Sequence, residues 1–256
     1  TSSDCQDLLD SPKDLGLSSP NTLPNYGIGD MSAGIAYQLS QQGSPGRGTW
    51  RSVWLRVTGR FPNGTQPNPG ILLDQGTGAK RKAVQLDGIA EYGKRSGGIR
   101  GELTYQHALP VNSLTRPTAP DQLIVPASYL SAVTTQAGDS LAITARPWIN
   151  FAPHLALSGM LQYWRRGLSS TTYLAGQAPV PNVDPSQLDV GSSANALVGS
   201  IGLSYFHDGR AKDGTIALPL EAGWSIERTL KSSSGIFPVA LTSRLYLRIY
   251  RPLITH

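Results

Sequence analysis

The chain has 256 residues, of which 15% are charged, and it carries 28 glycines, 19 prolines and a net charge of +5. Its mean hydropathy is -0.20, and it contains no run of about 18 apolar residues, which excludes an ordinary transmembrane helix. A single cysteine, Cys5, excludes an intramolecular disulfide framework and a thiolate metal cluster. The basic residues are dispersed and form no run interleaved with aromatic residues, so we expect no nucleic-acid partner.

Nine segments alternate apolar and polar residues, and we predict that each is a β-strand, because a strand turns successive side chains to opposite faces. No segment shows the 3.6-residue periodicity of a helix of useful length. In chain order the predicted strands cover 31–40, 49–61, 83–93, 99–109, 139–151, 154–166, 194–207, 215–230 and 239–251.

The alternation gives each predicted strand one apolar and one polar face. In 99–109, Ile99 and Leu103 lie on one face, whereas Arg100 and Glu102 lie on the other, and 241–251 has the same pattern. A soluble β-sandwich hides its apolar face in the interior, whereas a barrel in a membrane turns that face to lipid. We therefore predict an all-β fold, a transmembrane antiparallel up-and-down β-barrel.

The predicted connections differ in length. Three are long, at 62–82, 110–138 and 167–193, and those between them are short. Outer-membrane barrels have short periplasmic turns and long external loops, so residues 1–30 are expected to form an extended segment or external loop. Residues 31–256 are expected to form the barrel, whose last strand ends in the periplasm.

The number of strands bears on completeness. Bacterial single-chain barrels have an even number of strands, whereas nine are predicted here. The chain lacks an initiating Met and a signal segment, so we expect a processed form or a fragment, with upstream strands belonging to a barrel of 10–12 strands. The alternative is a missed strand within 1–30 or 110–138, where 122–126 and 129–133 are weak candidates.

One segment resembles a known class of proteins. The sequence Tyr26-Gly-Ile-Gly-Asp-Met-Ser-Ala-Gly-Ile-Ala-Tyr-Gln-Leu39 is similar to the opening of a loosely annotated group of Gram-negative outer-membrane barrels. The turn Phe61-Pro-Asn-Gly64, the stretch Asp74-Gln-Gly-Thr-Gly78 and the hairpin at 152–157 also resemble that group. The resemblance implies a transport-type barrel of about twelve strands with further strands upstream.

The chain departs from that group at two positions. Its last residue is His256 rather than an aromatic residue, and Pro147 interrupts the outward face of a predicted strand. Proline cannot donate to the ladder of hydrogen bonds, so we expect a bulge or an edge at Pro147.

Charged residues of both signs are expected on the inward face, where they either line a pore and set its field or pair into a hydrated plug. These candidate pore-lining residues are Arg56, Arg60, Asp87, Glu91, Arg100, Glu102, Arg146, Glu221, Glu227, Arg244 and Arg248.

Aromatic residues near strand ends or on outward positions suit the bilayer boundary. They are Trp50, Tyr92, Tyr105, Tyr163, Tyr205 and Trp224; the alternative role for them is ligand stacking inside the pore. The opposite parity of Trp54, Trp148 and Trp164 turns them inward, where they contact a solute or fill space.

No catalytic, cofactor or metal site is predicted. His154 and Ser158 share a face but lie roughly 13 Å apart along a strand, too far for proton transfer. We therefore expect a pore or transport channel in the bacterial outer membrane, with membrane lipid, lipopolysaccharide and a small-molecule solute as partners. The alternatives are a closed structural or assembly barrel whose external loops contact partner proteins, and, third, an outer-membrane hydrolase.

Overall fold

The main sheet of this protein is antiparallel and contains nine strands. Their order in the sheet follows their order in the chain, and the three strands omitted from this order form a second, smaller sheet. The computed structural model describes residues 28–44, 48–69, 77–78, 80–117, 129–207, 220–233 and 240–249. The nine strands are β1 (Met31–Gln42), β2 (Trp50–Phe61), β3 (Ala83–Lys94), β4 (Gly97–Ala108), β7 (Ser140–Ala152), β8 (Leu155–Arg166), β10 (Ala194–His207), β11 (Leu220–Ser232) and β12 (Leu241–Ile249).

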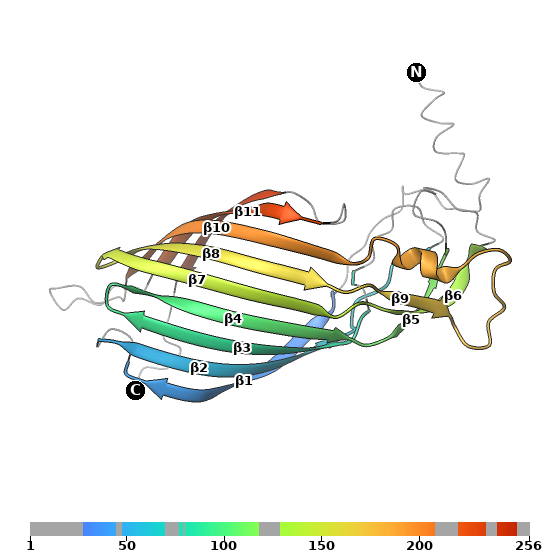
Figure 1. The fold of residues 1–256 in the computed structure, drawn as a ribbon, viewed down its shortest axis with the longest axis horizontal. Helices are drawn as coiled ribbons and strands as arrows, with labels where there is room; N and C mark the ends of the chain where they lie inside the picture. Colours follow the sequence, from blue (N-terminus) through green and yellow to red (C-terminus); the bar gives the residue numbers. More distant parts are fainter. Residues whose placement is uncertain are drawn as a thin grey trace, which may run out of the picture.

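These strands confirm the all-β, up-and-down prediction. Eight of the nine begin and end within two residues of the predicted bounds, and β11 is described from Leu220. Figure 1 shows the tight turns β3–β4 and β7–β8 at one end of the sheet, and the long connections β4–β7 and β8–β10 at the other. Because β1 and β12 run in the same direction, β12 ends on the side of the short turns, as the alternation of loop lengths predicted.

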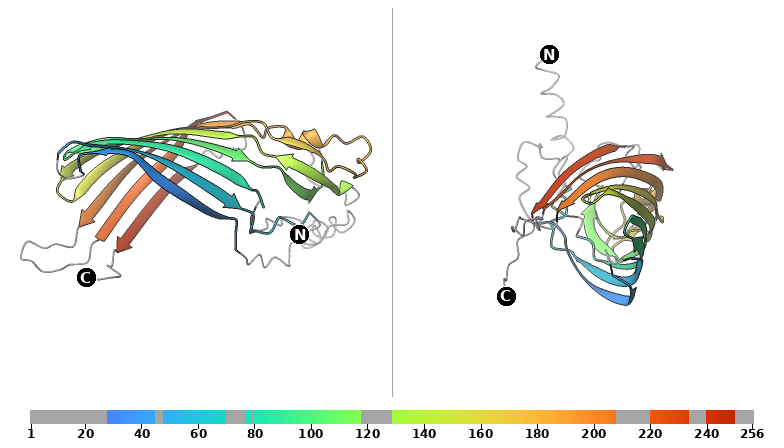
Figure 2. Two further views of the ribbon diagram at one scale, coloured as in Figure 1. Left: turned by 90° about the horizontal axis from the view of Figure 1, so that it is seen from below. Right: turned by 90° about the vertical axis from the view of Figure 1, so that its left-hand side faces the viewer.

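The sheet curves strongly but does not close. Seen along the strands, it forms a trough whose two edges are β1 and β12 (Figure 2). Register shifts interrupt the ladders at Gln38/Ser40, Asn150/Ala152 and Leu197/Val198. Bulges of this kind increase the local twist and curvature of a sheet.

Pro147 does not cause the predicted bulge. It pairs with Ile99 of β4 on one side, and on the other side the β7–β8 ladder omits Arg146 and Pro147 but keeps its register. The proline ring lies over Gly159, where an added Cβ would be 3.6 Å from the ring. The ring is therefore accommodated beside β8 without a shift of the register.

A second, three-stranded sheet lies beyond the long-loop end. It contains β5 (Val111–Thr115), β6 (Ser131–Gln136) and β9 (Ser170–Tyr173) in the order β5-β6-β9, and a 3-10 helix, η3 (Pro185–Asp189), follows β9 (Figure 1). These elements fall in the connections that were predicted as long loops. β6 overlaps the weak candidate 129–133 but belongs to this small sheet, and 122–126 lies outside the described residues.

Burial in the main sheet is inverted relative to a soluble protein. In β3, Asp87 and Ile89 are buried on one face, whereas Val84 and Leu86 on the other face are 49% and 44% exposed. The same holds across the sheet: outward residues such as Ile143, Leu161 and Ile201 are at least half exposed. The face that carries the charged residues is therefore the sheltered, inward one, and the apolar face is bare.

The described part of the chain contains no helix that is both long and apolar enough to cross a membrane.

Candidate functional site

A connected group of charged side chains lies on the inward face of β2, β3 and β4. Arg56 donates from Nε to Asp87 at 2.8 Å and from an Nη atom to Glu102 at 3.1 Å. Arg100 pairs with Glu91 at 3.1 Å and with Glu102 at 3.7 Å. Glu102 thus bridges the two arginines, and we call these five residues the inward charge network.

Asp87 is the most enclosed member of the inward charge network. Its side chain has no exposed surface, and both carboxylate oxygens are occupied. Thr104 donates to one oxygen at 2.7 Å, Gln85 donates at 2.8 Å, and Arg56 occupies the other. A buried carboxylate is costly unless it is paired and hydrogen-bonded, and here neighbouring strands supply both.

The other candidate pore-lining residues share this face by register. Glu221 pairs with Arg248 at 3.2 Å and Glu227 pairs with Arg244 at 3.7 Å, in both cases between β11 and β12. Arg146 lies opposite Arg100 on β7. Arg60, like Arg146, forms no ion pair with another described residue. The eleven residues therefore lie on one face as a network, two pairs and two single arginines.

Inward tryptophans flank a pair of glycines near the short-turn end. Across four strands the register runs Trp50, Gly93, Gly98, Trp148. A Cβ at Gly93 would lie 2.6 Å from Nε1 of Trp50, and one at Gly98 would collide with the ring of Trp148. The two rings, with centroids 6.3 Å apart, occupy the space that the glycines leave. Trp50, one of the set of aromatic residues near strand ends or on outward positions, therefore faces inward at the start of β2.

The remaining aromatic residues of that set lie on the outward face. Trp224 is 45% exposed and donates from Nε1 to Ser243 at 2.9 Å, while Tyr92, Tyr105 and Tyr163 are 40–52% exposed. Tyr92, Tyr205 and Trp224 lie toward the short-turn end, and Tyr105 and Tyr163 toward the long-loop end. Among the inward tryptophans, Trp54 donates to Ser52 at 3.2 Å, and Trp164 lies beside Arg166.

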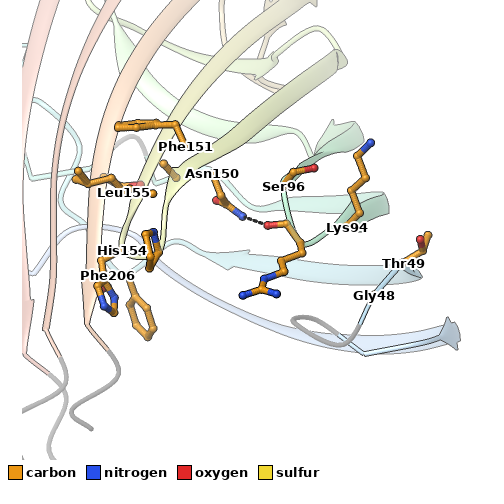
Figure 3. A pocket seen from close by; sticks show the side chains of 14 residues that line it. Gly48, Thr49, Lys94, Ser96, Asn150, Phe151, His154, Leu155 and Phe206 are labelled. Atoms are coloured by element: carbon orange, nitrogen blue, oxygen red, sulfur yellow. Dashed lines mark hydrogen bonds between the residues drawn. The ribbon is translucent and has the colours of Figure 1, made fainter. Parts of the chain in front are cut away.

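A hollow of about 850 Å³ opens at the short-turn end (Figure 3). Three hairpin ends surround it, and Asn150 donates to the carbonyl oxygen of Arg95 at 2.9 Å across it. The ring of His154 lies 5.4 Å from that of His207 and 6.0 Å from that of Tyr205. The hollow is wide, and few polar groups converge in it. Its shape therefore suits the open end of a barrel better than a ligand pocket.

A second cavity, of about 330 Å³, lies at the opposite end, between the main sheet and the small sheet. Two arginines, several hydroxyl groups and one carboxylate line it. The sequence did not predict this cavity, because its walls come from β5, β6, β9 and η3, which were predicted as loops.

The two residues considered for a hydrolase, His154 and Ser158, contact different groups. Nδ1 of His154 lies 2.9 Å from the carbonyl oxygen of Phe206, and the Ser158 hydroxyl donates to the carbonyl oxygen of Gly202 at 3.3 Å. Both side chains are thus turned to the backbone of β10 and not to each other. No group of three His, Cys, Asp or Glu side chains suited to a metal occurs among the described residues.

Comparison with known proteins gives no matching family model and no significant match to a curated protein. The candidate function therefore depends on geometry and chemistry alone.

Proposed function

We propose that this chain forms the wall of a transmembrane β-barrel in the outer membrane of a Gram-negative bacterium, and that a small solute crosses along its inward face. The observation that carries the proposal is the inverted burial of the sheet. Exposed apolar side chains cover the outward face of all nine strands, and such a surface is stable against lipid but not against water.

The distribution of charge supports this proposal. Every carboxylate within the nine described strands is on the inward face. The basic residues of the outward face, Arg51, Lys94, Arg165, Arg228 and Lys231, lie toward strand ends, and the band between them is uncharged. Basic side chains near the strand ends would lie at the depth of the phosphate groups of membrane lipid and lipopolysaccharide.

Strand length fits the same environment. A transmembrane strand of a barrel needs about 9–11 tilted residues to cross the hydrocarbon. The nine strands contain from 9 residues in β12 to 14 in β10, so each is long enough to cross.

The pattern of ion pairs favours a pore over a plug. A plug requires charged side chains that pair across the interior, whereas each ion pair described on the inward face lies within one strand or joins strands that are adjacent or one strand apart on the same wall. The inward charge network stays within β2, β3 and β4, and the other two pairs stay within β11 and β12. Pairs of this kind line a wall and leave the space in front of it open.

A structural or assembly role is the second candidate, and one observation favours it. The long connections are organised into a sheet, β5-β6-β9, with η3 beside it, at one end of the molecule. A folded cap of this kind offers a defined surface to another protein, which a flexible loop does not.

The experiment that tests the proposal is single-channel conductance of the refolded protein in a planar bilayer. We expect stable ohmic steps whose preference between cations and anions changes when Arg100 is replaced by Glu. Inserted but silent protein would favour the assembly role. Solubility without detergent, with no difference in SDS migration between boiled and unboiled samples, would overturn the membrane assignment itself.

A further inference from the structure

The cavity at the long-loop end contains two arginines with no carboxylate partner. Arg81, just before β3, and Arg166, the last residue of β8, both line it, and neither forms an ion pair with another described residue. Both are partly buried. Two arginines in the wall of one small cavity create a local positive field that favours an anion.

Arg166 is held in place on one side. Its Nε donates to the carbonyl oxygen of Ser192 at 3.0 Å, and its guanidinium carbon lies 5.9 Å from the ring centroid of Trp164. Ser192 is itself fixed, because its hydroxyl accepts from the backbone N–H of Ser169 at 2.9 Å. The Nε contact leaves the terminal amino groups of Arg166 for an oxyanion, the geometry in which arginine binds carboxylate and phosphate.

The carboxylate in the cavity is already satisfied. Asp189, at the end of η3, accepts from the backbone N–H of Thr171 at 2.8 Å and from the Thr171 hydroxyl at 2.7 Å. It is 7% exposed. Both of its oxygens therefore bind β9 to η3. The cavity lining contains one negative charge and two positive charges, so its net charge is positive.

Hydroxyl groups form much of the remaining wall. Ser113 and Thr115 come from β5 and Thr135 from β6. Serine and threonine hydroxyls both donate and accept, so they match the hydroxyl groups of a polyol. The volume of about 330 Å³ is at the lower end of the range of small-molecule pockets, about 300–1,000 Å³.

We propose that this cavity binds a small polyhydroxylated carboxylate, whose carboxylate is held by Arg81 and Arg166 and whose hydroxyl groups contact β5 and β6. Because Arg166 and Trp164 are on the inward face of β8, the cavity adjoins the face along which the solute is proposed to cross. It is the loading site of that path, and this role rests on the proposed pore function.

The test is isothermal titration calorimetry of the detergent-refolded protein with D-gluconate and with D-glucose, which has similar size and hydroxyl groups but no charge. We expect gluconate to bind at least tenfold more tightly than glucose. The Arg166→Gln and Arg81→Gln variants should each weaken gluconate binding at least tenfold. The matched control is Arg165→Gln, one residue away on the outward face, which should change the affinity less than twofold.

Equal affinity for the two sugars, no gluconate binding, or an equal loss in Arg165→Gln would overturn the site. The boiled and unboiled migration of each variant shows whether it has folded, and Arg81→Gln tests the site independently if Arg166→Gln does not fold. Conductance of the same preparations separates the two proposals. If the protein binds gluconate but does not conduct, the proposed site is supported and the proposed pore is overturned. If the protein conducts but does not bind gluconate, the pore is supported and the site is overturned.

Discussion

Asp87 depends on Arg56 for the only cation within reach of its enclosed carboxylate among the described residues. Replacing Arg56 with Met leaves the carboxylate buried with only Thr104 and Gln85 as donors. Loss of a charged hydrogen bond to a buried group costs about 2–3 kcal/mol of stability. We expect this loss in urea titrations of the refolded protein in detergent, followed by tryptophan fluorescence.

The matched control for Arg56→Met is Arg244→Met. The pair of Arg244 with Glu227 is longer, at 3.7 Å, and its side chains are 64% and 30% exposed. Exposed pairs contribute at most about 1 kcal/mol. An equal loss in both variants would mean that the inward charge network is as solvated as the pair at the sheet edge.

Gly93 marks a second point where one residue decides the local packing. A Cβ added there meets the ring of Trp50 at 2.6 Å, whereas one added at Gly88, in the same strand, has no atom within 4 Å. We expect Gly93→Ala to displace the ring and change the near-ultraviolet circular dichroism of the tryptophans, and Gly88→Ala to leave it unchanged. Identical spectra for both variants would contradict the packing of Trp50 on Gly93.

At the scale of elements, the nine long strands could be predicted because each continues its alternation for nearly its whole length. β5, β6 and β9 could not, since they have only 5, 6 and 4 residues and consist largely of Ser and Thr, which give no apolar period. The faces of the charged residues followed from parity. Their partners did not, because Arg56 meets Asp87 only through a register that the sequence does not specify.

The entry to β7 is held by a cluster that depends on pH. Asp139, which precedes β7, accepts from the Tyr105 hydroxyl at 2.5 Å and lies 2.7 Å from Nδ1 of His107. The hydrogen bond from Tyr105, and then the contact with His107, hold the pKa of Asp139 below its usual value. A carboxyl with a lowered pKa in the folded state stabilises it above the unfolded pKa of about 3.9, and this stabilisation is lost as the pH falls through the folded value.

We therefore expect the connection between β6 and β7 to open as the pH falls below about 4. Hydrogen exchange of residues 137–140, measured at pH 3 and pH 6, should show this opening in the native protein. Asp139→Asn should exchange faster at pH 6 and lose most of the difference between the two pH values. An unchanged pH difference in that variant would show that another group controls the opening.

At the scale of the whole molecule, the two free edges restrict how the sheet can close. Nine antiparallel strands place β1 and β12 in the same direction, so direct closure would need a parallel pair. An odd number of further strands between them would restore a fully antiparallel barrel with an even count. This geometry agrees with the expectation of 10–12 strands, and the source of those strands stays a prediction.

The environment of the outward face can be measured by placing a charge at two depths. Leu103, in the middle of β4, and Val84, near the long-loop end of β3, are 51% and 49% exposed and lie on the same face. If water covers this face, arginine at either position would change the free energy of unfolding by little. In a bilayer, arginine costs about 2–4 kcal/mol at the midplane and about 0–1 kcal/mol near the interface. We therefore expect Leu103→Arg to destabilise the protein refolded in lipid vesicles far more than Val84→Arg does, with unfolding in urea as the measurement. Equal, small effects would mean that water covers this face, and the apolar band would then need a protein partner instead of lipid.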